Sequence, residues 1–375
     1  MSDSQSRRAV VSATDIDPDR HDHGQRTFLQ YRLAHETPAE MLGASLYELA
    51  PCKRTWPAHY HSGNEEALFV LEGELTLWLG PLGDRREFAL APGSYVALPT
   101  GPAHAHEVEA TGEDVARFIV VSTMCEPDFT VLDGSSDVER MAHLVAGDPP
   151  GEYGGRYVSR TLDFDAEVPY WGEESDDEAG ASESDEGDGD DDEDGADESD
   201  ADRTSSIDDA AGVEDHAVSV DSLPWDEYDP PRDGHRFRRK QVGAAAGGVE
   251  LGTSLYEVPA GNRTWLPHYH TGNEEAIYVL DGEGTVVLGA NRETREVGAG
   301  DYAALPTGEA GYHDVVAGES GLRYLVFSTM REPDITVYPD DDMVGLYAGS
   351  APGGPPDERT LSTYLDASAE VDYWD

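Results

Sequence analysis

The chain repeats itself, and this internal duplication constrains its fold more than any other feature. Residues 42–80 read LGASLYELAPCKRTWPAHYHSGNEEALFVLEGELTLWLG, and residues 251–289 read LGTSLYEVPAGNRTWLPHYHTGNEEAIYVLDGEGTVVLG. About 24 of these 39 positions are identical without a gap. The match continues downstream, where LAPGSYVALPTG pairs with VGAGDYAALPTG and VVSTMCEPDFTVL pairs with VFSTMREPDITVY. The chain therefore contains two homologous units, which we expect to share one fold.

The two units and the segment between them divide the chain into four predicted parts. We expect a flexible N-terminus over residues 1–21, a first domain over 22–171, an acidic linker over 172–230 and a second domain over 231–375. The first half of the linker is rich in Asp, Glu, Gly and Ser. It buries too little apolar surface to offset the entropy of ordering, so we predict that the linker is mostly disordered. Aromatic residues return from Val218 onward, and we expect that part to pack on the second domain.

Within each unit the hydrophobic pattern is that of β-strands. The runs ALFVLEGELTLWL and AIYVLDGEGTVVL are apolar or alternating, and Glu-Gly or Asp-Gly turns interrupt them. Further short apolar runs are YVALP, FIVVST and YLVFST, and no long helical period appears. Only residues 138–145 have a pattern that admits a helix. Many short strands with Gly and Pro turns predict an all-β sandwich or barrel in each unit.

The net charge of the chain restricts the solvent conditions in which it is stable and the partners that it can bind. It carries 78 acidic and 25 basic residues, a formal net charge of -53. Such a surface repels nucleic acid and anionic membranes, so we expect neither as a partner. Self-repulsion of this size is screened at molar salt, where the Debye length is roughly 3 Å, and we therefore expect a halophilic archaeal source. No apolar run has the length of a membrane span, and the two cysteines do not indicate a disulfide framework. A cytoplasmic protein is expected.

Each unit places histidines and a glutamate where they can act together. In the first unit His59 and His61 are two residues apart, so on a strand both side chains point to one face. A Gly-Asn turn follows, and a hairpin then brings Glu66 beside the two imidazoles. Further on lie His104 and His106. The second unit repeats the pattern with His268, His270, Glu275 and His313. Two or three imidazoles with one carboxylate form a ligand set for a divalent first-row metal.

These residues resemble the motifs of the cupin family. The first motif, G-x5-H-x-H-x3-4-E-x6-G, is matched by His59, His61, Glu66 and Gly73, and again by His268, His270, Glu275 and Gly282, although both units lack the leading glycine. The spacing to the closing glycine selects Glu66 and Glu275 over Glu65 and Glu274, which we expect to face solvent or cap the turn. The resemblance implies two jelly-roll β-barrels, a bicupin, each with a metal bound near one mouth. The family's metals include Fe, Mn, Ni, Cu and Zn.

Two histidines of the first unit are candidates for the fourth metal ligand, because the second motif of the family selects one and the duplication selects the other. The motif G-x5-P-x-G-x2-H-x3-N starts at Gly93 and places its histidine at His104. Alignment of the two units from ALPTG pairs His106 with His313, and His104 with Gly311. A site shared by both units therefore implies His106 and His313, with His104 as the alternative metal ligand.

The resemblance implies several functions, because cupins support many chemistries. The leading expectation is a metal-dependent enzyme acting on a small oxygenated organic molecule, with dioxygenase chemistry as its leading version. A metal-dependent isomerase and a non-catalytic module that binds or senses a small ligand are the alternatives. The expected partner is a small-molecule ligand or substrate. The chain is expected to be either a monomer with its two barrels paired or a homodimer. No catalytic residue beyond the metal ligands is assigned.

For other notable residues we expect structural roles or exposure to solvent rather than a role in the site. Trp56 and Trp265 precede the histidine pairs and are expected mainly in the core. The basic stretch HRFRRK at residues 235–240 alternates like an edge strand. His216 has no partner in the repeat and is expected to be solvated.

Overall fold

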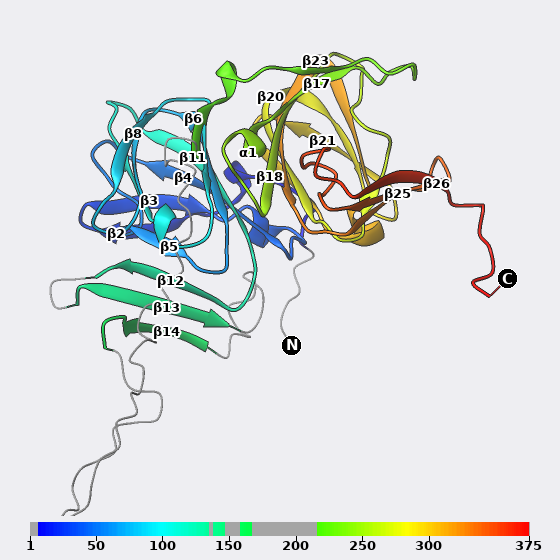
Figure 1. Ribbon diagram of the computed structural model, residues 1–375. Coiled ribbons are helices and arrows are strands. Elements are labelled where there is room, and N and C mark those ends of the chain that lie inside the picture. The colour runs from blue at the N-terminus through cyan, green and yellow to red at the C-terminus, as the bar shows by residue number, and fades with distance from the viewer. Residues whose placement is uncertain (1–6, 135–137, 147–157, 167–215, 375) are drawn as a thin grey trace, which may run out of the picture.

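Two β-barrels lie side by side in the computed structural model, which describes residues 7–134, 138–146, 158–166 and 216–374 (Figure 1). The prediction of an all-β fold is therefore confirmed. Residues 172–215 of the predicted acidic linker lie outside the described residues. In the part of the chain that is described, no helix is long and apolar enough to span a membrane.

The N-terminal barrel consists of two facing antiparallel sheets. In spatial order the first contains β14 (Val158–Asp163), β13 (Arg140–Ala146), β12 (Asp128–Asp133), β5 (His59–His61), β10 (His106–Ala110), β7 (Leu75–Leu79) and β8 (Arg86–Leu90). The second contains β15 (Ala217–Ser219), β9 (Ser94–Leu98), β6 (Glu66–Glu72), β11 (Ala116–Thr123), β4 (Leu42–Leu49), β3 (Arg26–Tyr31) and β2 (Asp19–His23). Residues 138–145 fall mainly in β13 rather than in a helix, because β12 and β14 pair with both of its edges.

The C-terminal barrel repeats this architecture. Its larger sheet runs β1 (Val10–Ser12), β22 (Asp301–Leu305), β20 (Glu275–Leu288), β23 (His313–Thr329), β18 (Leu251–Val258), β17 (Phe237–Gln241) and β16 (Asp226–Tyr228), and β21 (Glu293–Gly298) pairs with β20. Its smaller sheet runs β19 (Tyr269–His270), β24 (Asp334–Tyr338), β25 (Met343–Ala348) and β26 (Leu361–Asp366). The helical segments are short: η1 (Ala13–Asp15), η2 (Ala34–Glu36), η3 (Pro102–His104), η5 (Val220–Ser222), α1 (Val242–Ala245) and η6 (Gly308–Gly311).

The motif's closing glycine marks a change of direction in each barrel: at Gly73 the chain passes from one sheet to the other, and at Gly282 it bends within one sheet. β6 ends just before Gly73, whereas its counterpart β20 continues through a register shift next to Gly282. Both glycines have positive φ, 77° and 83°. A Cβ at Gly282 would lie 2.2 Å from the carbonyl oxygen of Gly321. Only glycine meets both requirements, the backbone conformation and the close approach.

One sheet in each barrel is apolar on both faces, because it lines its own barrel and also packs against the other. Along β6, Leu68 and Val70 belong to the core inside the N-terminal barrel. Ala67 and Phe69 alternate with them and belong to a core shared by both barrels. Strand β20 repeats this, with Ile277 and Val279 inside its barrel and Ala276 and Tyr278 at the shared core. Burial of both faces explains why these strands read as continuous apolar runs.

The barrels also exchange short strands. β1 precedes the N-terminal barrel in sequence but pairs with β22 of the C-terminal one, with Val10 opposite Ala303. β15 precedes the C-terminal barrel but pairs with β9 of the N-terminal one, with Ala217 opposite Val96. Residues 10–12, expected within a flexible N-terminus, instead form a strand at a sheet edge. Val218 pairs with Tyr95 of the first barrel, whereas the carbonyl of Val220 accepts a hydrogen bond from Lys240 Nζ of the second, so this segment contacts both barrels.

Two buried glutamates connect the barrels reciprocally. Glu65 and Glu274 are each 1% exposed, so the expectation that they face solvent is wrong. The Glu274 carboxylate accepts hydrogen bonds from the backbone N–H groups of Glu40, Met41 and Leu42 at 2.8, 3.1 and 3.0 Å. Burial raises the pKa of each carboxyl to about 7. Each glutamate immediately precedes the glutamate of the predicted metal site, so the same loop serves the site and the interface.

The Glu65 carboxylate makes the equivalent contacts in the opposite direction. It accepts hydrogen bonds from the backbone N–H groups of Val249, at 3.0 Å, and Glu250, at 2.5 Å. Since Val249 and Glu250 precede β18, as Glu40 and Met41 precede β4, the two contacts are related by the duplication.

We expect Glu274→Gln to destabilise the protein, because an amide nitrogen cannot accept hydrogen bonds from the buried N–H groups. The free energy of unfolding should fall by about 1–3 kcal/mol, and Glu65→Gln should behave alike. Denaturant titration in molar potassium chloride measures this. Glu296→Gln is the matched control, because Glu296 is exposed on β21. Equal stability of the Glu274 variant and this control would contradict the interpretation.

Candidate metal sites

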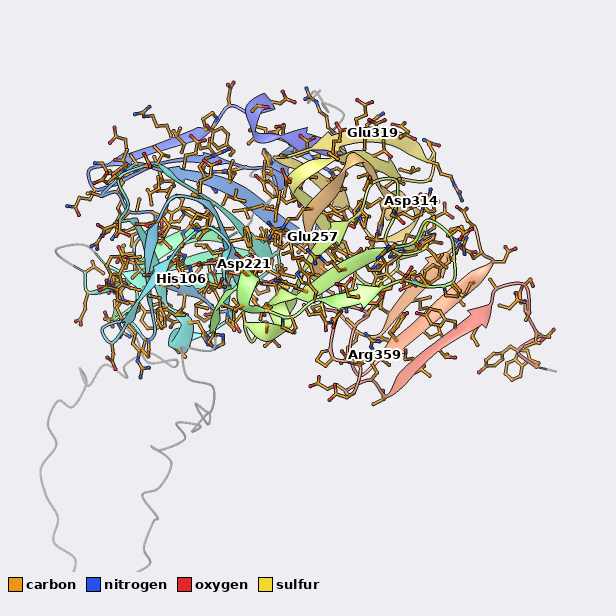
Figure 2. All side chains as sticks on the ribbon, turned by 90° about the horizontal axis from the view of Figure 1, so that it is seen from above. His106, Asp221, Glu257, Asp314, Glu319 and Arg359 are labelled. Atoms are coloured by element: carbon orange, nitrogen blue, oxygen red, sulfur yellow. The ribbon has the colours of Figure 1, made fainter. Side chains whose placement is uncertain are left out.

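Strand pairing brings the predicted histidines to one place in each barrel. β5 carries His59 and His61, and β10 begins at His106, which lies directly opposite His59 in the ladder. In the C-terminal barrel His268 and His313 form the same cross-strand bridge. Directly opposed residues of an antiparallel pair have neighbouring side chains, so the fourth histidine faces the first. Figure 2 shows His106 within the N-terminal barrel.

The predicted glutamate meets these histidines from the neighbouring sheet. Glu66 is the first residue of β6. Its Oε2 lies 3.2 Å from His106 Nε2 and 3.7 Å from His61 Nε2. Potential ligand atoms of His59, Glu66 and His106 all lie within 4.8 Å of one another. The ring of His59 is centred 5.4 Å from that of His61.

The C-terminal barrel has the same geometry. Glu275 Oε2 lies 3.5 Å from His313 Nε2 and 3.7 Å from His270 Nε2. Potential ligand atoms of His268, Glu275 and His313 again lie within 4.8 Å of one another. The ring of His270 is centred 5.0 Å from that of His268. Two copies that diverged in sequence have thus retained one arrangement.

Hydrogen bonds hold each imidazole with its Nε2 toward the glutamate. In the N-terminal site, His59 Nδ1 lies 2.7 Å from the Pro57 carbonyl oxygen, and His106 Nδ1 lies 3.1 Å from that of His104. In the C-terminal site, the Nδ1 atoms of His268 and His313 have the same partners, the carbonyls of Leu266 and Gly311. A carbonyl oxygen only accepts, so these Nδ1 atoms carry the proton. Each Nε2 therefore presents a lone pair to a cation.

An aspartate orients the remaining histidine of each site. His61 Nδ1 lies 2.7 Å from Asp128 Oδ2, and His270 Nδ1 lies 2.6 Å from Asp334 Oδ2. The other Asp128 oxygen accepts a hydrogen bond from the backbone N–H of Gly63 at 2.7 Å. Asp128 and Asp334 were not among the predicted site residues. Their signal was the EPD sequence present in both units, whose aspartate is the first residue of β12 or β24.

Burial and local charge give the site neutral imidazoles beside an ionised carboxylate. Burial, with the nearby His106 and His61, lowers the pKa of His59 to about 3, and the pKa of His268 falls for the same reason. Burial also acts against ionisation of Glu66, but the surrounding histidines outweigh it and hold the pKa of Glu66 below its usual range. His61 is the exception, because Glu66 and Asp128 overcome burial and raise its pKa. A deprotonated glutamate with free imidazole lone pairs is the state that binds a divalent metal.

His104, the alternative ligand, lies outside this group. Its Nδ1 is 3.3 Å from the Thr100 carbonyl oxygen, and its ring packs edge-on against His216 with 4.7 Å between centroids. His216, expected to be solvated, is buried there. The backbone of η3 carries His104 away from the ladder position that His106 occupies opposite His59.

Each site opens into a cavity whose size differs between the barrels. The N-terminal cavity encloses about 470 Å³ and the C-terminal one about 930 Å³. Trp56 and Trp265 line them as well as packing against Phe28 and Phe237, so they serve pocket and core together. Both volumes suit a small organic molecule next to the metal-binding group.

Known proteins share this architecture at low sequence identity. The family model described as a cupin domain matches residues 45–122 and 254–328. No curated protein matches the sequence. Among solved structures, an arginine-to-alanine variant of Bacillus subtilis oxalate decarboxylase is 16% identical with a TM-score of 0.52, covering 89% of this chain and 80% of that one. The same enzyme, studied through the EPR of its Mn(II) centres, is 14% identical with a TM-score of 0.50, covering 89% and 80%. The chain therefore carries two cupin domains in tandem, the arrangement of a bicupin.

Proposed function

We propose that the protein is a metal-binding bicupin that acts on a small oxygenated organic molecule, with dioxygenase chemistry as the leading activity. The ligands are His59, His61, Glu66 and His106 in one barrel, and His268, His270, Glu275 and His313 in the other. The observation that carries this is the convergence of three donors in each barrel, two histidines and the glutamate, at the wall of a cavity, with Nε2 of the remaining histidine 3.7 Å from the glutamate. Fe, Mn, Ni, Cu and Zn all accept such ligands, and the Mn(II) centres of oxalate decarboxylase support manganese among them.

The residues around each site prepare it for an oxygen-bearing ligand. A divalent metal bound by these residues would supply a Lewis acid that polarises ligand oxygens. The Tyr47 hydroxyl oxygen lies 3.0 Å from Gln30 Nε2, which donates to it, and 3.4 Å from Trp56 Nε1. Its own proton is therefore available to a molecule in the cavity. Burial raises the pKa of Tyr47 to about 12, so this donor stays protonated at neutral pH.

Oxygen consumption separates the leading activity from the alternatives. A dioxygenase consumes O₂, a metal-dependent isomerase converts its substrate without O₂, and a binding or sensing module retains its ligand unchanged. The apolar wall of the N-terminal cavity, which includes Leu68, Leu98 and Val108, excludes water and suits any of the three.

Metal content should follow the histidines. We expect protein purified in molar potassium chloride and loaded with Mn²⁺ to hold about two metal equivalents per chain, and His59→Ala to hold about one. Elemental analysis by mass spectrometry checks this. His23→Ala is the control, since His23 is exposed on β2 and should leave the content unchanged. Retention of two equivalents by a variant that lacks both His59 and His268 would refute the assignment.

The orienting aspartates should tune affinity without removing a ligand. Asp128→Asn keeps the shape of the side chain but loses the charge that holds His61, so we expect metal affinity at that site to fall about 10- to 100-fold. Competition with a fluorescent chelator measures the dissociation constants of both sites. Asp334→Asn should weaken the other site alone, and Asp114→Asn, exposed and remote from both, should weaken neither. Unaltered affinity in the Asp128 variant would mean that the carboxylate only braces the loop.

The reaction itself can be tested by O₂ uptake with catechols and enolic ketones. We expect uptake by the Mn²⁺- or Fe²⁺-loaded protein with at least one compound, and its loss when His59 and His268 are both replaced by alanine. Product formation without uptake would support the isomerase alternative. Tight binding without any product would support the binding module.

A further inference from the structure

Equivalent residues of the two units line the two cavities at many positions. The positions that differ therefore indicate how the ligands of the two sites differ. The duplication aligns Tyr47 with Tyr256, and each pairs with a residue of the neighbouring strand, β3 or β17. The residue opposite Tyr47 is Gln30, and the residue opposite Tyr256 is Arg239. The Tyr256 hydroxyl accepts hydrogen bonds from Trp265 Nε1, at 3.0 Å, and from Arg239. One barrel thus places a neutral amide where the other places a guanidinium.

Arg239 lacks the partner that arginines in this acidic chain usually have. Arg238, the residue before it, points to the opposite face of β17 and pairs with Glu257, 2.7 Å from Nε to Oε2. Arg239 points into the barrel and lines the cavity that contains the metal-binding group. No ion pair within 4.0 Å in the described part of the chain includes Arg239, and its Nε is buried without a hydrogen-bond partner. Asp226 acts on it only from a greater distance.

Aromatic rings flank this guanidinium. Asp226, opposite Arg239 on β16, also lines the cavity but forms no ion pair with Arg239 within 4.0 Å. The central carbon of the guanidinium lies 5.7 Å from the ring centre of Tyr228 and 5.8 Å from that of Trp265. Such contacts stabilise a cation without using its hydrogen-bond donors, so apart from the bond to Tyr256 the guanidinium N–H groups remain available. A desolvated guanidinium with free donors favours a carboxylate, whose two oxygens match its fork. The other arginine at this cavity, Arg359, differs because its guanidinium donates to the carbonyls of Ala351, Pro352 and Gly354 (Figure 2).

The opposite wall of the C-terminal cavity is also distinctive. The positions of Leu132 and Thr161 in the N-terminal cavity are occupied here by Tyr338 and Tyr364. The Tyr338 ring stacks on metal-site His268, 5.5 Å between centroids at 29°. These flat surfaces suit a planar ligand extending from the metal site.

We propose that Arg239 makes the C-terminal site selective for planar organic carboxylates, whereas the N-terminal site, with Gln30 at that position, takes uncharged molecules. This rests on the proposed function, since the ligand's oxygen donors are taken to meet the metal while its carboxylate meets Arg239. Arg239 is a specificity-determining residue in this assignment, and the two barrels of one chain hold ligands of different charge.

The test compares two probes that differ only in a carboxylate: 3,4-dihydroxybenzoate and catechol. The protein is full-length His59→Ala loaded with Mn²⁺, which keeps the C-terminal metal site alone, and calorimetry measures both affinities. We expect 3,4-dihydroxybenzoate to bind about 10- to 100-fold more tightly than catechol, and Arg239→Gln to abolish this preference. Arg238→Gln, on the outer face of the same strand, should retain it, and Arg239→Lys should retain part of it.

Two outcomes overturn the proposal: no preference for the carboxylate in the parent protein, including failure to bind either probe, or an undiminished preference in Arg239→Gln. The complementary protein, His268→Ala, keeps the N-terminal metal site and should show no preference for the carboxylate. Metal analysis of the same samples keeps the two proposals apart. Absence of metal counts against the proposed function, while metal retained with equal binding of both probes counts against the role of Arg239 alone. A melting curve for each variant separates loss of binding from loss of folding, and Arg239→Lys remains informative where Arg239→Gln does not fold.

Discussion

The burial of one sheet on both of its faces underlies the rest of this structure. A barrel strand normally alternates apolar residues inside with polar residues outside. Here β6 and β20 are apolar on both sides, because each barrel uses the other as its second layer. The ends of these same strands carry Glu66 and Glu275 into the metal-binding groups, and Glu65 and Glu274 into the interface. Interface and site are therefore consecutive residues of one turn, and a shift of either barrel displaces both.

The metal-binding groups are organised before any cation arrives. Carbonyl oxygens or carboxylates occupy every Nδ1, so the imidazoles have one usable orientation. The loop that follows each histidine pair is tied to the barrel through Asp128 or Asp334. A cation binding here loses little free energy to side-chain ordering, since rotamers and tautomers are already selected. The buried carboxylate then supplies the charge that favours a divalent ion.

Local patterns in the sequence predicted the strands, and the duplication predicted more than a single motif would have done. It selected His106 over His104, because only His106 has a counterpart in the second unit, and the ladder places that residue opposite His59. What escaped prediction depends on contacts between the units. Glu65 reads as a polar residue at a turn, and nothing local shows that backbone N–H groups from the other barrel surround its carboxylate. β1 and β15 are three residues each, too short to carry a strand signal, and their partners lie about 290 and about 120 residues away.

Arg239 shows that the alternation of side chains along a strand can place a charged residue inside a barrel as well as outside it. In sequence it belongs to the basic stretch at residues 235–240, which has the alternation of a surface strand. The alternation is real, but the strand has one face outside and one inside the barrel. Arg238 therefore meets the carboxylate of Glu257, while Arg239 meets aromatic rings and a cavity. Duplication preserved the metal-binding groups in both halves and left the walls free to diverge. The proposed role of Arg239 follows from this divergence: a glutamine in one copy and an arginine in the other would make one site favour uncharged ligands and the other favour anionic ones.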